Sequence, residues 1–154
     1  MEGSLLRVLV VDDFEPFRRF VCSTLGQRPD LKVIGEASDG LEALQKAEEL
    51  QPELILLDMR LPKQNGIEAA RQIRRVAPMS KILFVSGESD LEWVRSAFRA
   101  GGFGYVSKME AGAGLLAGIE AVLRGERFVS PGLADSNDVT DARDSDLEDE
   151  ETAT

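Results

Sequence analysis

The strongest constraint on the fold of this chain is a regular alternation between short apolar segments and segments with helical spacing. The apolar segments are rich in Val, Ile and Leu and show little polar alternation, which is typical of strands buried on both faces. Strands are predicted in five segments: RVLVVDD (7–13), LKVIGEA (31–37), ELILLDM (53–59), KILFVSG (81–87) and FGYVSK (103–108). Helices are predicted in the segments that follow them: 15–27, 40–50, 67–76, 90–101 and 113–125.

This order gives five βα units with short connections, and such units build a parallel sheet covered by helices on both faces. Right-handed crossovers between parallel strands then produce a doubly wound arrangement. The predicted fold class is therefore α/β: a five-stranded parallel sheet with five helices in a flavodoxin-like sandwich. In folds of this class the functional site lies at the carboxyl ends of the strands.

The chain divides into a domain predicted over residues 5–128 and an acidic tail over residues 129–154. Residues 135–154 hold nine acidic residues and one arginine, so most of the net charge of −10 belongs to the tail. The tail is predicted to be disordered, because it has almost no apolar residues to bury. The remaining chain is nearly balanced in charge and has no basic stripe, so direct binding to nucleic acid is not expected.

Composition narrows the functional classes further. The absence of histidine argues against a zinc site or a His-based catalytic triad. The single cysteine, Cys22, excludes an internal disulfide and fits a reducing cytoplasm. No apolar run approaches the roughly 20 residues of a membrane span, and the N-terminus lacks the basic region and cleavage site of a signal peptide. A cytoplasmic protein without a membrane partner is expected.

Polar side chains follow the predicted strands at the points where these strands end. They are two aspartates after the first strand, one after the third, a serine at the end of the fourth and a lysine at the end of the fifth: Asp12, Asp13, Asp58, Ser86 and Lys108. Taken singly, each has an ordinary interpretation as a helix cap, a turn residue or a solvated strand end. Because the carboxyl ends of parallel strands meet at one edge, we expect the five side chains to converge.

Three carboxylates in one pocket need a hard cation to compensate their charge. Oxygen ligands without histidine or thiolate suit Mg²⁺, with Mn²⁺ as a substitute. A metal, the Lys108 ammonium and the Ser86 hydroxyl would together form a pocket for a phosphoryl group. Asp58 lies in the middle of the predicted sheet with cations on either side, so we interpret it as the nucleophile that forms an acyl phosphate.

These residues and spacings resemble the receiver domain of two-component response regulators. The resemblance runs from about Leu5 to about Phe128 and rests on the motifs VVDD, LLDMRLPKQNG, VSG and GYVSK. Within the family, LLDMRLPKQNGIEAARQIRR and LRGERFVSPGL look most similar to the NarL/FixJ branch, which carries a LuxR-type helix-turn-helix domain. In this chain the acidic tail follows where that domain would stand.

The resemblance implies a role for each site residue. Asp58 would accept the phosphoryl group, and the metal would be held by Asp12, Asp13, Asp58 and the backbone carbonyl of Arg60. Lys108 would pair with the phosphoryl group.

Two further residues complete the switch that the resemblance implies. Ser86 would sense the phosphoryl group, and Tyr105 would match the aromatic residue that turns inward when Ser86 moves.

The resemblance also implies partners. The phosphodonor would be a histidine kinase or a histidine phosphotransfer protein, and an output protein that the sequence does not name would read the surface formed by residues 90–125. A second copy of the chain is a further partner expected on phosphorylation. Such a protein is not an enzyme beyond catalysing its own phosphorylation and dephosphorylation.

Three other functions stay open at this point. One is a phosphoryl carrier or sink in a phosphorelay, and another is the receiver part of a DNA-binding transcriptional regulator. The third is an aspartyl-phosphate hydrolase. Arg60 argues against this function, because it stands two residues after Asp58, where such an enzyme would have its second, acid–base aspartate.

Arg60 and Glu88 suggest a finer hypothesis. They come two residues after Asp58 and Ser86, so they should flank the pocket mouth and could pair across it. There they would restrict the attacking water and tune the lifetime of phospho-Asp58. Met109 follows Lys108 where many receivers have proline, so the sequence leaves the isomer of this peptide bond open.

Overall fold

The structure is a computed structural model that describes residues 5–133. These residues form a parallel sheet of six strands in the order β2-β1-β3-β4-β5-β6, and every neighbouring pair of strands is parallel. The strands are β1 Leu6–Val11, β2 Leu31–Ala37, β3 Leu54–Leu57, β4 Lys81–Ser86, β5 Gly104–Ser107 and β6 Phe128–Val129. The order in which strands are added to the sheet reverses between β1 and β3, and this switch point places a crevice at their carboxyl ends.

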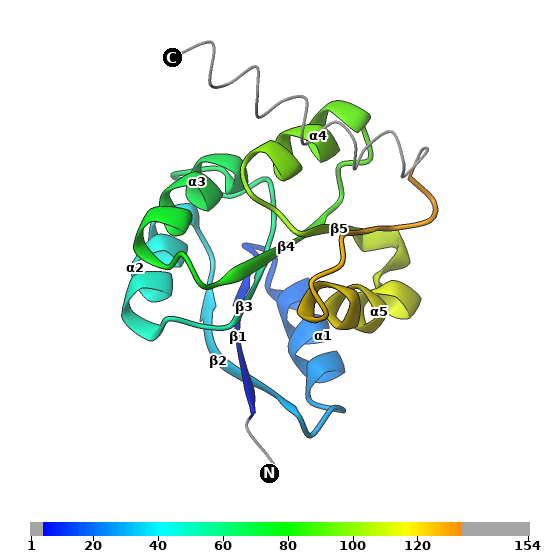
Figure 1. Ribbon diagram of the computed structural model, residues 1–154, viewed down its shortest axis with the longest axis horizontal. Coiled ribbons are helices and arrows are strands. Elements are labelled where there is room, and N and C mark those ends of the chain that lie inside the picture. The colour runs from blue at the N-terminus through cyan, green and yellow to red at the C-terminus, as the bar shows by residue number, and fades with distance from the viewer. Residues whose placement is uncertain (1–4, 134–154) are drawn as a thin grey trace.

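Five α-helices cover the two faces of the sheet. They are α1 Glu15–Leu25, α2 Gly40–Leu50, α3 Gly66–Val76, α4 Leu91–Arg99 and α5 Ala111–Leu123, and a short 3₁₀-helix, η1 Lys108–Glu110, precedes the last. Figure 1 shows α1 and α5 on one side of the sheet and α2, α3 and α4 on the other. The predicted doubly wound sandwich is confirmed. Among residues 5–133, no helix is long and apolar enough to cross a bilayer.

The alternation of side chains along β1 explains why both faces of the sheet are covered. Val8 and Val10 point into the core beneath α1 and α5, whereas Leu9 and Val11 point into the core beneath α2, α3 and α4. All four side chains are buried, and each buried Val or Leu contributes about 1.5–3 kcal/mol relative to an exposed one. A strand buried on both faces leaves polar residues only at its ends, which is where Asp12 follows.

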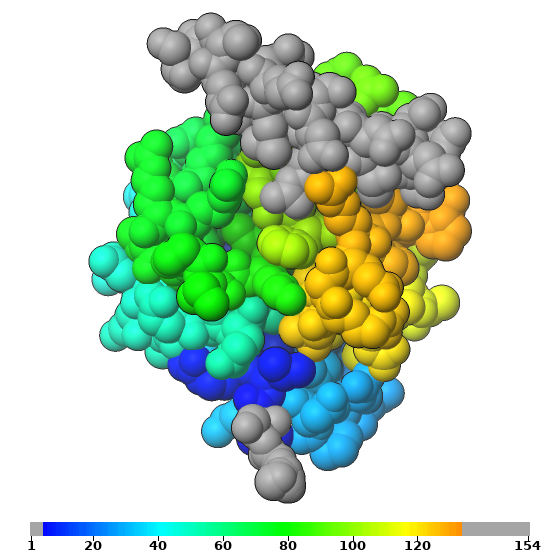
Figure 2. All heavy atoms as spheres, viewed as in Figure 1, coloured from blue at the N-terminus to red at the C-terminus, as the bar shows by residue number. Residues whose placement is uncertain are grey.

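The sixth strand was not among the five that the sequence predicts, because its two residues are too short to carry a pattern. Phe128 and Val129 pair in parallel with β5, and the backbone N–H of Ser107 donates to the Ser130 hydroxyl at 2.9 Å. Leu133 is buried against the sheet. Residues 129–133, assigned by sequence to the acidic tail, thus pack on the domain (Figure 2, orange), whereas the rest of that tail, residues 134–154, lies outside the described residues.

The loop after β3 is held against the strand by a glycine. The backbone N–H of Gly66 donates to the Met59 carbonyl at 2.7 Å, and a Cβ at Gly66 would lie 2.1 Å from the Asp58 carbonyl oxygen. Any side chain at this position would therefore push the loop away from Asp58. The Asn65 side chain caps α3 by accepting from Glu68 N–H at 2.9 Å, which fixes where the loop ends.

Candidate functional site

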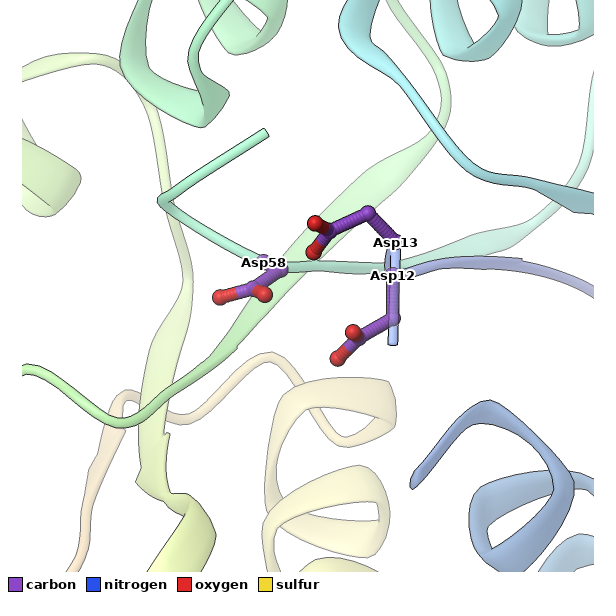
Figure 3. Close-up of side chains that lie close together, drawn as sticks. All are labelled: Asp12, Asp13 and Asp58. Atoms are coloured by element: carbon purple, nitrogen blue, oxygen red, sulfur yellow. The ribbon is translucent and has the colours of Figure 1, made fainter. Parts of the chain in front are cut away.

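Three aspartates meet at the carboxyl edge of the sheet. Asp12 and Asp13 follow β1 and Asp58 follows β3, and these two strands pair with Val11 opposite Leu57. Their carboxylate groups lie close together (Figure 3), and one carboxylate oxygen from each lies within 4.8 Å of the others. Asp12 is 2% exposed and Asp58 5% exposed, whereas Asp13 is exposed at the mouth.

Burial and like charge act together on Asp58. Removal from water, followed by the nearby Asp12 charge, raises the pKa of the Asp58 carboxyl to about 6, although Lys108 acts in the opposite direction. The Met59 backbone N–H donates to Asp58 Oδ1 at 2.7 Å. One oxygen of Asp58 is therefore held by the backbone, and the other faces the pocket.

Lys108 supplies a positive charge to this pocket. Its Nζ lies 2.8 Å from Asp12 Oδ2 and 3.1 Å from Asp58 Oδ2. Burial of the ammonium disfavours its charge, but the two carboxylates outweigh burial and raise the pKa of Lys108. The ammonium also lies 4.6 Å from the centroid of the Phe17 ring on α1, so a cation–π contact helps to hold it in place.

The donor set fits a hard divalent cation. Lys108 balances one of the three carboxylates, so a dication would neutralise the remaining charge. Carboxylate oxygens are ligands that Mg²⁺ prefers, and Mg²⁺ commonly keeps several waters, for which the exposed side at Asp13 leaves access. Asp12, Asp13 and Asp58 can therefore hold a metal, and the Arg60 carbonyl stays a predicted additional ligand.

Ser86 and Tyr105 are linked through one residue, Glu88. The Ser86 hydroxyl at the end of β4 is buried and accepts from the Glu88 backbone N–H at 3.1 Å. Tyr105 is fully buried, and its hydroxyl donates to the Glu88 carbonyl at 2.6 Å. Burial raises the pKa of Tyr105 to about 12, with a smaller opposing effect from Ser86. Tyr105 thus lies inward, with its ring stacked on Phe84 at a centroid distance of 6.4 Å.

Arg60 and Glu88 pair beside the pocket. The Arg60 guanidinium donates through Nε to Glu88 Oε2, and its central carbon lies 5.4 Å from the Trp93 ring centroid on α4. A hollow of about 440 Å³ that includes Asp13 is lined by Arg60 and Trp93. The pair predicted from sequence is therefore formed, and its role in the lifetime of a phosphoryl group stays a prediction.

Two contacts were missed by reasoning from sequence. Phe17 on α1 lies over the Lys108 ammonium, and Trp93 on α4 packs against Arg60. No sequence motif marks either aromatic residue as a neighbour of the site. A cation–π contact joins residues distant in sequence, so no local pattern reveals it. The Lys108–Met109 bond, whose isomer the sequence leaves open, is trans.

The fold and the site together define a flavodoxin-like α/β protein with an acidic, lysine-bearing site at the carboxyl edge of its sheet. Residues 8–120 match the family described as the response regulator receiver domain. The chain belongs to this family, and the receiver domain predicted from the motifs is confirmed.

Relatives and solved structures agree with this assignment. The chain is 35% identical over 130 residues to the response regulator GacA of Pseudomonas viridiflava, covering 84% of this chain and 61% of that protein. It is 38% identical over 122 residues to the transcriptional regulatory protein LiaR of Bacillus subtilis, covering 79% and 58%. The chain thus spans about three fifths of the length of these curated relatives.

Two solved structures have a similar fold. A LuxR-family two-component response regulator from Aurantimonas sp. SI85-9A1 has a TM-score of 0.80 and 33% identity, covering 93% of this chain and 98% of that one. The response regulator domain of Thermotoga maritima CheB has a TM-score of 0.73 and 33% identity, covering 79% and 98%. The flavodoxin-like receiver fold is confirmed by these neighbours.

Proposed function

We propose that this receiver domain is a phosphorylation-dependent switch in which Asp58 accepts a phosphoryl group from a partner phosphohistidine. The observation that carries the proposal is the placement of Asp58, buried beside Asp12 and within 3.1 Å of the Lys108 ammonium. A buried carboxylate beside a cation suits a nucleophile whose product is a more highly charged acyl phosphate.

The transfer forms one bond and breaks one. The free oxygen of Asp58 bonds to phosphorus, the P–N bond of the donor phosphohistidine breaks, and its electron pair stays on the imidazole nitrogen. Lys108 pairs with an oxygen of the transferred group. Asp12, Asp13, Asp58 and the Arg60 carbonyl would hold Mg²⁺, which when bound supplies charge neutralisation for the phosphoryl oxygens.

Ser86 connects this event to α4. Its hydroxyl oxygen accepts from the Glu88 N–H, so its proton remains available to donate to a phosphoryl oxygen. Movement of Ser86 toward that oxygen would displace Glu88, which also binds the Tyr105 hydroxyl and the Arg60 guanidinium. The phosphoryl charge would therefore shift the population of arrangements of α4 and β5.

The Arg60–Glu88 pair would tune the lifetime of the acyl phosphate. It stands at the mouth through which a hydrolytic water must pass, and the Trp93 ring limits the positions that Arg60 can adopt. Replacing both residues, as Arg60→Met with Glu88→Gln, should change the autodephosphorylation rate. An unchanged rate in a single-exponential decay measurement would contradict this role.

The output surface of the switch would be formed by α4, β5 and α5. It would present the state of Asp58 to an output protein or to a second copy of the chain. The proposed place of action is the cytoplasm, with a histidine kinase or a histidine phosphotransfer protein as donor. The domain would catalyse only its own phosphorylation and dephosphorylation.

Two alternatives use the same site. The relatives are longer and LiaR is named a transcriptional regulatory protein, which favours the receiver part of a transcriptional regulator; salt-dependent DNA binding by the protein would support that alternative. A phosphoryl carrier would instead transfer the group from Asp58 onto a histidine of a partner, which a radiolabel transfer assay measures.

The proposal is tested by intact-mass measurement after incubation with a small acyl phosphate and Mg²⁺. We expect a mass increase of one phosphoryl group, lost in Asp58→Asn and kept in Asp90→Asn, the control at the exposed start of α4. An unmodified wild-type chain, under this donor and a phosphohistidine donor alike, would contradict the proposal.

A further inference from the structure

A hollow lined by arginines lies between α3 and α4, away from the acidic site. It measures about 370 Å³, and the side chains that line it are Arg71, Arg74, Arg75 and Arg99. Arg74 and Arg75 stand in the last turn of α3 and Arg99 in the last turn of α4. Because each helix runs antiparallel to the strands, this hollow lies at the edge of the sheet opposite to Asp58.

The arginines are positioned by their surroundings. The Arg74 side chain lies against Gly101, where φ is +106° and where an added Cβ would come within 2.4 Å of the Arg74 Cδ. Arg99 donates to the Ser96 hydroxyl at 3.2 Å, and Arg71 lies 3.7 Å from Glu68. Arg71, Arg74 and Arg75 are exposed, so the guanidiniums on α3 are within reach of an anion in solution.

Among residues 5–133, the arginines on α3 carry more positive charge than their acidic partner balances. A guanidinium near a helix C-terminus is stabilised by the helix dipole. This effect explains why one arginine at the end of a helix is favourable, but it does not explain four arginines around one hollow. The four arginines around this hollow repel one another. In the part of the chain that the structure describes, the three on α3 have one acidic partner, Glu68, which pairs with Arg71. Such a cluster suits a ligand that carries several carboxylates, because guanidinium and carboxylate pair through two parallel hydrogen bonds.

The chain itself contains such a ligand. Nine carboxylates lie in residues 135–154, and four of them recur at every third position: Asp135, Asp138, Asp141 and Asp144. We propose that this acidic segment binds in the arginine hollow between α3 and α4.

The path from the last described residue to the hollow is short enough. Leu133 and Ser89 line a common hollow of about 350 Å³. Ser89 lies two residues before α4 begins, and Arg99 ends α4. The nine residues of α4 span about 14 Å at 1.5 Å per residue. Residues 134–139 alone can span about 20 Å when extended, so the chain is long enough for the aspartates after residue 139 to reach the hollow. A tethered segment also acts at an effective concentration of the order of millimolar.

Binding of the acidic segment in this hollow would act on α4. α4 carries Trp93 near its start, beside Arg60, and Arg99 at its end. A segment that bridges the last turns of α3 and α4 would hold α4 against α3 from the edge opposite to the phosphorylation site.

The test uses the whole chain in its unphosphorylated form, so it is independent of the proposed function. Cys22→Ser removes the native thiol, and Ser145→Cys carries a nitroxide label within the acidic segment. We expect loss of amide NMR signal intensity in the last turns of α3 and α4. The intensity should return with Arg74→Gln/Arg75→Gln, and also at about 1 M salt, where the Debye length falls to about 3 Å.

A charge-matched control distinguishes binding in the hollow from non-specific attraction between the acidic segment and other positive charges of the domain. Arg19→Gln/Arg124→Gln removes the same charge from exposed arginines on α1 and after α5, and should leave the signal loss at α3 and α4 in place. The proposal is overturned if the label causes no loss at these turns, or if the loss persists in Arg74→Gln/Arg75→Gln.

Discussion

The two edges of the sheet gather charges of opposite sign under different conditions. At the carboxyl edge, Asp12 and Asp58 are buried and lie within 3.1 Å of one lysine. At the opposite edge, Arg74 and Arg75 are exposed on the last turn of α3. Water screens the arginines but is largely excluded from the buried aspartates, so the same number of charges has a larger energetic effect at the carboxyl edge.

The two edges should respond differently to a bound ligand. At the buried edge, the ends of the strands determine where the carboxylates lie. A divalent cation or a phosphoryl group bound there should change the free energy of unfolding by a few kcal/mol. The exposed edge is built by side chains on two helices, and a carboxylate bound there should be displaced by high salt.

Metal binding at the acidic edge should give the largest change in stability. At a Mg²⁺ concentration about 100-fold above its Kd, the free energy of unfolding should rise by about 2.7 kcal/mol. Asp13→Ala removes an exposed carboxylate of the cluster and should abolish most of this gain. Thermal unfolding with Mg²⁺ and with a chelator measures the effect, and an equal gain in Asp13→Ala would contradict the metal site.

The metal-free acidic edge should become less stable as the pH rises. The pKa of Asp58 is raised to about 6, above the roughly 3.9 of an unfolded chain. The protonated carboxyl is therefore favoured on folding, and its stabilising contribution, present below about pH 4, is lost as the pH rises through about 6.

In a chelator at neutral pH, Asp58→Asn should therefore raise the free energy of unfolding by about 1–3 kcal/mol. The gain should shrink as the pH falls through about 6. Urea unfolding at several pH values measures it, with Asp13→Asn as the exposed control that should gain less. A gain in Asp58→Asn that does not depend on pH would contradict the assigned burial effect.

Removal of the Phe17 ring should weaken the placement of Lys108. Phe17→Leu keeps an apolar side chain but loses a cation–π contact worth about 0.5–2 kcal/mol, so phosphorylation by a small acyl phosphate should slow several-fold. Phe20→Leu, at an exposed position on the same helix, is the control. Equal rates for Phe17→Leu and the wild type would show that the ring does not position the ammonium.

Replacement of arginines at the opposite edge should have the smallest effect on stability. Arg74→Gln/Arg75→Gln should change the free energy of unfolding by less than about 0.5 kcal/mol, because both side chains are exposed. Denaturant unfolding at low and high salt measures the change. A loss of several kilocalories would mean that these arginines stabilise the fold itself, and the contrast between the edges would fail.

The sequence predicted the fold and the members of the acidic site because both follow from strand periodicity. Apolar runs that end at Asp12 or Asp58 specify which residues lie at the carboxyl edge, and the topology then brings them together. The strand β6 escaped prediction because two residues carry no periodic pattern, and residues 130–133 are held by Ser130 and Leu133.

Contacts between side chains of distant elements were predicted less completely. The pairing of Arg60 with Glu88 was anticipated from their shared offset after Asp58 and Ser86. The contacts of Phe17 with Lys108 and of Trp93 with Arg60 depend on rotamers and helix placement, which no short motif specifies. The arginine hollow depends likewise on the approach of α3 to α4, two helices whose arginines lie more than twenty positions apart in the sequence.

The central claim is that a charge added at Asp58 is transmitted to α4, and the single tryptophan of the chain reports on it directly. Trp93 lies on α4 against Arg60, so its fluorescence should change when Mg²⁺ and a small acyl phosphate are added together. The change should saturate with the phosphorylated fraction measured by mass, and be absent in Asp58→Asn. Full phosphorylation of the wild type with unchanged Trp93 emission would contradict the account.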